Sequence, residues 1–499
     1  MTRHSIRTGA GFIGLTTFAL IPWISSADDD HSLELSDEFV PYEELGEGFT
    51  ERPKPVTEVI EDTLFPVNRE RDELIKERNE GNPDIEVPER KTLFGENPFL
   101  GVGAITPGFE SPTGAIWQPS LIVYGQYRTA VQTFNNGVDE VSEWANRLDL
   151  FANYYLTPTE RILFAVRPLD FDGDFSGYRF GGNQGSGGVD AFNLEVRSLY
   201  FEGDFGEIFP RLDPDDSGNL DYGFSIGRQP VEFQDGIMIN DNFDAVGITR
   251  SSLFLLGSSA TRITAMYGRN EIDRGDNVLD RGASIYGLFL SSDYEKSTYD
   301  VDLAYVDGSQ ESGGDGMYLG IAQTRRFGHI NSTLRANFSW ALDEETPAIS
   351  TGTLLTAQLS RTPTWNNDLI YLNLFAGIDD YTSAARDPSV GGPLGNIGIL
   401  FAAIGLGDYG APLGNRANEA VGAAVGYQHF LEADKSRQLI VELGGRASTG
   451  GGGGDALALG AQYQHALTDH TILVLGGFGL ANEDRDAGYG ARIEMRVKF

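Results

Sequence analysis

Apolar and polar side chains alternate in many short segments between residues 116 and 499. In the last segment Ile493 and Met495 share one face, and Arg492 and Glu494 share the opposite face. A period of two is that of a β-strand, and a strand with one apolar and one charged face separates two unlike environments. The charged face would meet water in a soluble sandwich, or a polar lumen in a barrel whose outer face meets lipid.

The alternation recurs upstream, and the connections between its segments fall into two length classes. Alternating segments lie at 298–305, 332–340, 439–446 and 457–464, short turns at 156–160 and 465–470, and long Gly/Asp-rich loops at 172–190, 307–316, 382–396 and 448–455. Short turns on one side and long loops on the other are typical of membrane barrels. At about 20–24 residues per strand and connection, residues 116–499 are predicted to form an all-β, transmembrane antiparallel β-barrel of about 16–18 strands. A barrel of that size encloses an aqueous channel.

The residues before 116 lack this alternation and divide into two regions. Residues 1–27 combine a short basic start, an apolar run and small residues, which is the pattern of a secretory signal peptide cleaved near Ala27. A membrane anchor is the alternative, but the run is short and interrupted by polar residues. Residues 28–115 are acidic and Pro-rich. We expect them to form an acidic periplasmic extension, partly disordered or helical, with a short polar helix at 68–78.

The overall composition narrows the classes of function. The formal net charge is −36, which argues against nucleic acid as a partner because phosphate binding needs clustered Lys and Arg. The chain has no cysteine, which excludes disulfides, thiolate metal sites and cysteine nucleophiles. After residue 27 no apolar run is long enough for a transmembrane helix, so a membrane crossing would need a closed barrel.

The carboxyl-terminal residue, Phe499, is aromatic, and in this the chain resembles the outer-membrane barrels of bacteria. The resemblance implies a wall that contacts outer-membrane lipid and a last strand that the barrel-assembly machinery recognises. It also implies a location in the outer membrane of a Gram-negative bacterium.

One segment, residues 222–246, resembles the strand-and-loop signature of the alginate export protein family. The residues that carry the resemblance are Gly227, Arg228, Gln229, Asp235, Gly236, Phe243 and Asp244. The family implies a large, monomeric outer-membrane barrel that passes an anionic polysaccharide through a constriction lined by arginines. Pro230 and the spacing around Asp235 differ from the commoner form of the signature. The alternative for Arg228 and Gln229 is a role in strand register and rim hydrogen bonds alone.

Alternation also selects a set of arginines that would face the lumen. They are Arg128, Arg335, Arg446, Arg492 and Arg496. Guanidinium groups bind carboxylates through forked hydrogen bonds, so a ring of them would select anions. Glu442 and Glu494 fall on the same strand faces as the neighbouring arginines and could pair with them. Such pairs would create an electric field across the lumen but no net selectivity between anions and cations.

The sequence contains no convincing motif for a metal site, a cofactor site or an enzyme active site. Asp213, Asp215 and Asp221 match the first nine positions of a calcium loop, but Phe224 stands where the bidentate Glu is needed, so a solvated acidic turn is favoured. No Gly-x-Ser-x-Gly, His-Glu-x-x-His or Walker motif is present. The sequence therefore predicts a protein that is not an enzyme and needs no cofactor.

The resulting hypothesis is an outer-membrane channel that passes a hydrophilic, in particular an anionic or polysaccharide-like, solute by passive diffusion. The first alternative is a structural or partner-binding barrel that is docked through residues 28–115. The second is an outer-membrane enzyme whose Ser and His residues come together only in space.

Overall fold

The computed structural model describes residues 92–95 and 108–499, except 172, 184, 216, 310–312, 396 and 451–453. The predicted signal peptide, the cleavage position near Ala27 and the helix expected at 68–78 lie outside the described residues.

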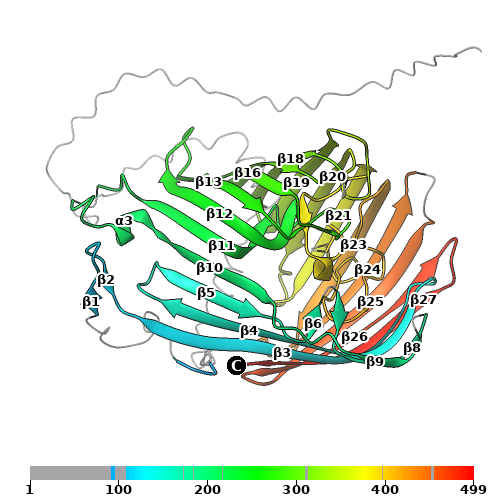
Figure 1. Cartoon of the computed structure of the whole chain (residues 1–499). Coiled ribbons are helices and arrows are strands. Elements are labelled where there is room, and N and C mark those ends of the chain that lie inside the picture. Colours follow the sequence, from blue (N-terminus) through cyan, green and yellow to red (C-terminus); the bar gives the residue numbers. More distant parts are fainter. Residues whose placement is uncertain are drawn as a thin grey trace, which may run out of the picture. The chain divides into compact units, whose positions relative to one another are not determined.

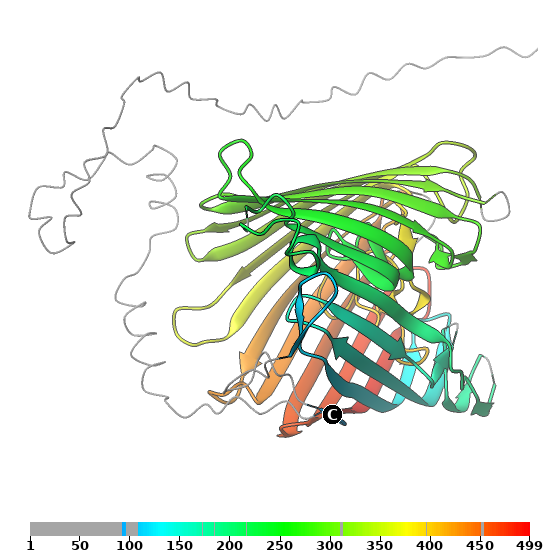
Figure 2. The same cartoon turned by 60° about the vertical axis from the view of Figure 1, so that its left-hand side comes forward.

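Eighteen antiparallel strands close into a barrel, at the upper end of the predicted range (Figures 1 and 2). They are β3 (Ser120–Asn135), β4 (Glu140–Tyr155), β5 (Arg161–Val166), β10 (Val196–Asp204), β11 (Tyr222–Phe233), β12 (Ile239–Leu253), β13 (Ala260–Arg269), β16 (Ser284–Asp293), β17 (Ser297–Asp307), β18 (Gly316–Phe327), β19 (Ile330–Ala341), β20 (Gly352–Arg361), β21 (Leu369–Asp379), β23 (Ala420–Phe430), β24 (Arg437–Ser448), β25 (Ala456–Thr468), β26 (Thr471–Asn482) and β27 (Gly488–Lys498). Each strand pairs with its neighbours in chain order, and β27 pairs with β3 to close the ring.

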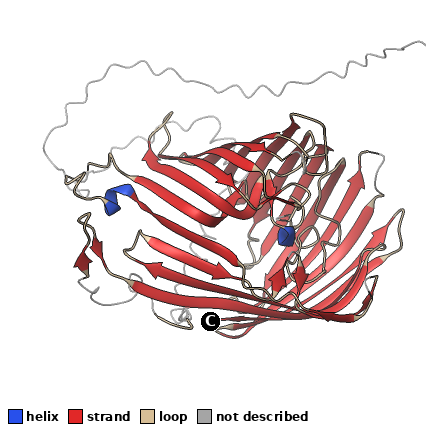
Figure 3. Ribbon diagram, in the orientation of Figure 1, coloured by secondary structure: helices blue, strands red, loops and turns tan. Residues whose placement is uncertain are grey.

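The remaining elements are short; β1 and β2 precede β3, and the others lie in the connections (Figure 3). They are β1 (Phe109–Glu110), β2 (Ile116–Trp117), β6 (Asp170–Phe171), β7 (Asp174–Phe175), β8 (Gly177–Gly182), β9 (Gly187–Val189), β14 (Ile272–Asp273), β15 (Leu279–Asp280), β22 (Ala385–Arg386), the helical turn α3 (Phe205–Ile208) and the 3-10 turn η2 (Pro388–Val390). None of the helices in the described ranges has the length and apolar character to cross a membrane.

The two faces of the wall differ as the alternation predicts. On β27, Ile493 is 59% exposed on the outside, whereas Arg492 is 4% exposed and Glu494 is fully buried inside. On β19, Leu334 is 44% exposed and Asn337 is fully buried. The outer face is therefore apolar, and the inner face carries the polar and charged side chains.

The connections differ between the two rims of the barrel. At the terminal rim, where β3 begins and β27 ends, they span 156–160, 205–221, 254–259, 294–296, 328–329, 362–368, 431–436 and 469–470. At the opposite loop rim they span 136–139, 167–195, 234–238, 270–283, 308–315, 342–351, 380–419, 449–455 and 483–487. Most of the turn expected at 465–470 is strand, because β25 and β26 pair down to Thr468 and Thr471. The loop expected at 382–396 is longer and runs over 380–419.

Candidate functional site: the constricted lumen

The longest connection of the barrel, residues 380–419, folds into the lumen (Figures 1 and 2). The backbone N–H of Leu400 donates to Glu442 on β24 over 2.8 Å, and the backbone N–H of Asp408 donates to Glu143 on β4 over 2.6 Å. Through β22 the same connection pairs with β12. Because β4, β12 and β24 are not neighbours in the ring, the connection reaches across the lumen between them. We call residues 380–419 the septum loop.

One side of the septum loop packs against the inner wall through an apolar cluster. The cluster contains the loop residues Leu394, Ile397, Leu400, Phe401 and Leu413 and the wall residues Leu354, Phe375, Ala420, Ala424, Ala458 and Leu480. Glycines make room in the wall, since a Cβ at Gly460 would lie 2.7 Å from one methyl carbon of Leu400, and a Cβ at Gly444 would lie 3.0 Å from the other. Burying one large apolar side chain contributes about 1.5–3 kcal/mol relative to leaving it exposed. The septum loop is therefore a packed part of the fold.

Arg386, in β22 of the septum loop, connects this loop to a second inward element. Arg386 is 3% exposed, and its guanidinium group donates hydrogen bonds to the backbone carbonyls of Gly391, Gly392 and Gly236. Burial lowers the pKa of Arg386 to about 10, which leaves the side chain cationic at neutral pH. Because Gly236 belongs to the connection between β11 and β12, this side chain binds both elements.

The second inward element is that connection, residues 234–238, which we call the hairpin tip. Gln234 and Asp235 have φ angles of 57° and 51°, the left-handed conformation that a tight reversal uses. Gln234 Nε2 donates to Asp302 on β17 over 2.7 Å, and Asp235 forms an ion pair with Arg335 on β19. Neither β17 nor β19 neighbours β11 or β12, so the hairpin tip also lies inside the lumen.

Two of the signature residues, Asp235 and Gly236, are thus part of the hairpin tip. Arg228 and Asp244 lie directly opposite each other in β11 and β12, with 3.0 Å between Nε and Oδ1. A second ion pair joins Arg228 to Glu271 over 2.5 Å. Arg228 also lines a cavity at the loop rim, so it pairs across the hairpin and borders open space.

The other signature residues support the hairpin through packing and backbone geometry. Gly227 has a φ angle of 128°, and a Cβ there would lie 2.2 Å from the carbonyl oxygen of Leu199. Phe243 is fully buried in an apolar cluster. Gln229 Nε2 donates to the carbonyl of Ala245 over 3.2 Å, which keeps a buried amide paired.

Three of the five arginines selected by alternation converge on one carboxylate, that of Glu494. Arg128 Nε lies 2.6 Å and Arg496 Nε lies 2.9 Å from Glu494 Oε1, and Arg492 pairs with the other carboxylate oxygen. The side chain of Glu494 has no exposed surface, and that of Arg492 is 3% exposed. These side chains therefore bind one another within the wall of the lumen.

Two of the five also contact the septum loop. Arg128 donates to the carbonyl of Gly405 over 3.4 Å, and Arg446 donates to the carbonyl of Leu413 over 3.4 Å. Arg147, which sequence reasoning missed, donates to the carbonyl of Gly405 over 2.9 Å. Alternation places a side chain on a face, but it carries no signal for the distant loop that this side chain meets.

A cavity of about 480 Å³ opens between the septum loop and the loop rim, and we call it the loop-side cavity. Its charged lining residues are Arg167, Arg197, Arg228, Arg281, Asp170, Glu195, Glu271, Asp273 and Asp387. Arg167 lies 2.9 Å from Asp149, and Arg197 pairs with Asp387. Arg281 forms no ion pair within the described part of the chain. The cavity therefore presents both signs of charge, with four arginines and five acids in its lining.

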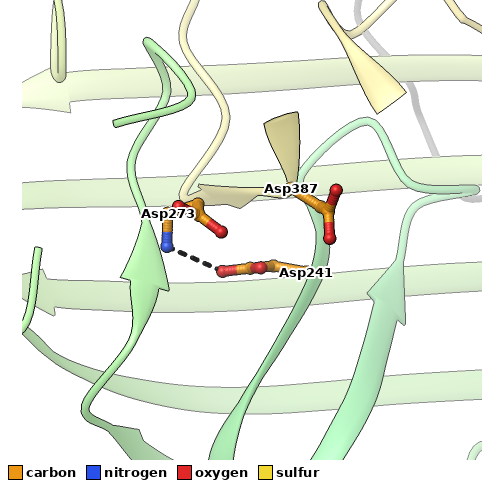
Figure 4. A group of neighbouring side chains, drawn as sticks. All are labelled: Asp241, Asp273 and Asp387. Carbon is orange, nitrogen blue, oxygen red and sulfur yellow. Dashed lines mark hydrogen bonds between the residues drawn. The ribbon is translucent and has the colours of Figure 1, made fainter. Parts of the chain in front are cut away.

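Asp241, Asp273 and Asp387 form an acidic trio at the edge of this cavity (Figure 4). One oxygen of each carboxylate lies within 4.8 Å of the others, and Asp241 accepts the backbone N–H of Asp273 over 2.8 Å. The guanidinium group of Arg197 pairs with Asp387 and supplies positive charge to the trio. The trio thus joins the septum loop to β12 and β14.

The acidic turn that resembles a calcium loop lies between α3 and β11. Asp213 accepts hydrogen bonds from the backbone N–H of Ser217 over 3.1 Å and from its hydroxyl over 2.9 Å, and these bonds lower the pKa of Asp213. Asp213 is partly exposed, and Asp215 is exposed. Through its hydrogen bonds with Ser217, Asp213 stabilises the turn.

Comparisons with known proteins identify the fold of the chain. No protein-family model matches the chain, and no curated protein matches it either. Among solved structures it is similar to the outer membrane protein OpdK from Pseudomonas aeruginosa, with a TM-score of 0.51 at 12% identity, covering 76% of this chain and 98% of that one. It is similar to a BenF-like porin from Pseudomonas fluorescens Pf-5, with a TM-score of 0.52 at 9% identity and the same coverage. It is also similar to OccK2 (OpdF) from Pseudomonas aeruginosa, solved in complex with glucuronate, with a TM-score of 0.51 at 10% identity, covering 76% and 98%. The chain therefore has the fold of outer-membrane porins.

Proposed function

We propose that the protein is a bacterial outer-membrane channel that passes a hydrophilic solute by passive diffusion, without covalent chemistry. The observation that carries the proposal is a closed ring of strands with an apolar outer face and a polar, charged inner face. Such a wall suits a bilayer outside and water inside. The export signal expected in residues 1–27 and the aromatic residue Phe499 are consistent with this location.

The septum loop and the hairpin tip would set the size limit of the channel. Both elements enter the lumen from the loop rim and meet at Arg386 and Gly236. A solute entering from the loop rim would first occupy the loop-side cavity. Because polar and charged groups line that cavity, a hydrated solute could exchange water for hydrogen bonds there.

For the solute we propose an anionic, uronate-like molecule. The resemblance of residues 222–246 to the alginate export family supports this class, and so does the porin fold of OccK2, which was solved with glucuronate. We assign the contact with the anion to Arg281 of the loop-side cavity, since Arg228 is paired with Asp244 and Glu271. Arg128, Arg492 and Arg496 are engaged with Glu494, which makes them less suited to binding a passing solute.

Single-channel recording of the refolded mature protein in a planar bilayer tests the proposal. We expect stable openings, block of the current by an oligouronate, and weaker block in Arg281→Gln than in Arg437→Gln, which removes an arginine from the first residue of β24, at the terminal rim. Openings without oligouronate block would leave a channel for another solute. A folded barrel that conducts nothing would contradict the channel and favour a barrel that docks a partner through residues 28–115.

A further inference from the structure

A second cavity, of about 300 Å³, lies beneath the hairpin tip, and we call it the terminal-side cavity. Its lining residues include Arg262 on β13, Ser291 on β16 and Asp300 on β17, each close to the end of its strand at the terminal rim. Gln234 and Asp235 of the hairpin tip line this cavity, whereas no residue of the septum loop does. The volume is at the lower end of the range for small-molecule sites.

Two buried polar atoms in this lining have no hydrogen-bond partner within the described residues. Gln234 is 6% exposed and donates to Asp302 through Nε2, but its Oε1 accepts no hydrogen bond. The side chain of Arg335 is 8% exposed, and it bonds Gln358 and Asp235 through its terminal nitrogens while its Nε has no acceptor. Buried polar groups are normally paired. The terminal-side cavity therefore offers one acceptor and one donor to a molecule that enters it.

The charge of the cavity is negative. Four carboxylates and two guanidinium groups line it, and the ion pair between Arg335 and Asp235 accounts for one of each. The remaining charged groups are Glu232, Asp300, Asp302 and Arg262. Three acids against one arginine would attract a cation and repel a carboxylate.

The spacing of these acids favours an organic cation over a metal ion. Within the described residues, the acidic trio is the group of three carboxylates close enough to share an ion, and its members do not line this cavity. Separated acceptors suit a polyatomic cation whose N–H donors point in different directions. Phe233 and Phe289 stack and border the same space, and they offer an apolar contact for a short carbon chain.

We propose that the terminal-side cavity binds small amines that also carry an oxygen acceptor. The ammonium group would contact Asp300, Asp302 and Gln234 Oε1, and the oxygen would accept from Arg335 Nε. The inference rests on the proposed channel function and adds to it a cavity that prefers cations.

Calorimetric titration of the folded full chain in detergent micelles tests the site independently of conduction. The probes are 5-amino-1-pentanol, 1,5-pentanediol and 5-hydroxypentanoate, which have the same chain length and differ in charge. We expect the amine to bind and the other two to show no measurable binding. Asp300→Asn should weaken amine binding about tenfold, the effect of losing one charge-assisted hydrogen bond.

Two further variants separate binding from folding. Glu295→Gln makes the same charge change in the exposed turn between β16 and β17 and should leave the affinity unchanged. Arg262→Gln removes the opposing positive charge and should tighten amine binding, a gain that a damaged fold would not produce. Equal binding of all three probes, or no binding of the amine, would overturn the proposed site.

Conductance in potassium chloride without any probe tests the proposed channel alone. If the barrel conducts and the amine neither binds nor blocks, the cavity proposal is wrong and the channel stands. If the amine binds selectively and the barrel conducts nothing, the site stands and the channel is wrong.

Discussion

The septum loop and the hairpin tip narrow the same lumen in different ways. The septum loop is the longest connection of the barrel, and it places Leu400 and Phe401 in an apolar cluster with the wall. The hairpin tip is short: Ile237 and Met238 are buried in apolar clusters, and polar contacts hold its other end, from Gln234 to Asp302 and from Asp235 to Arg335. The septum loop thus relies mainly on apolar packing, whereas Gln234 and Asp235 of the hairpin tip rely on a hydrogen bond and an ion pair.

This difference predicts different responses to substitution. Removing a buried apolar group loses both its transfer free energy and the packing around it. Removing the exposed partner of a half-buried ion pair costs less stability than that, but it changes the charge that a permeating ion meets. The septum loop should therefore govern the size and stability of the constriction, and the hairpin tip its charge.

The largest effect should come from removing the septum loop. Replacing residues 391–415 by a short Gly-Ser linker should raise single-channel conductance severalfold, because the obstruction across the lumen is gone. The strands on both sides of the loop are part of the ring and should still pair. Heat-dependent mobility in gels provides the control for a folded barrel, and unchanged conductance would show that the loop lies outside the conduction path.

A smaller effect is expected when the apolar cluster is weakened. Leu400→Ala should lower the free energy of unfolding by about 2–5 kcal/mol, the usual cost of truncating a fully buried leucine. Urea titration followed by tryptophan fluorescence measures it. Leu431→Ala, in an exposed turn at the terminal rim, is the matched control and should change stability little. Equal losses in both variants would contradict a packed septum loop.

The contact between the two elements can be broken at Arg386. Arg386→Met removes hydrogen bonds to three backbone carbonyls, including the bond to Gly236, and leaves those carbonyls buried. We expect the septum loop and the hairpin tip to move independently, and hence noisier current with frequent brief closures at an almost unchanged mean conductance. Quiet, wild-type openings would show that packing alone positions both elements.

The smallest effect should come from Asp235→Asn in the hairpin tip. It removes the ion pair with Arg335 and one negative charge of the terminal-side cavity. Because the side chain of Arg335 is buried but keeps its hydrogen bond to Gln358, the free energy of unfolding should fall by about 1–2 kcal/mol. The reversal potential in a salt gradient should shift toward anions, and Asp434→Asn, in an exposed turn, serves as the control. A large loss of stability would mean that the hairpin tip is packed as the septum loop is.

Much of the wall could be predicted from local patterns. Alternation along the last strand assigned Ile493 to the outside and Glu494 to the inside, and the structure has both there. The strand number followed from length and spacing. By contrast, the turn expected at 465–470 is mostly strand, because pairing between β25 and β26 continues beyond the point where polar residues suggest a turn.

The candidate site was much less predictable. Alternation shows which arginines face the lumen, but it does not show which acids they contact. The sequence therefore does not distinguish a ring of arginines that binds anions from a set of arginines paired with acids. The structure shows Arg128 and Arg496 paired with Glu494, which leaves Arg281 of the loop-side cavity as a better candidate for contact with an anion. Arg281 had no pattern to distinguish it, because it lies in a connection rather than in an alternating strand.

The sequence by itself determined the barrel. The two-residue alternation of apolar and polar side chains is a local property, which can be recognised in each strand separately. Only the tertiary structure decided how the lumen is divided. The septum loop has no such period, and its contacts join residues far apart in the chain, as Arg128 and Gly405 are. Contacts of that kind depend on the shape of the closed ring, which no single segment encodes.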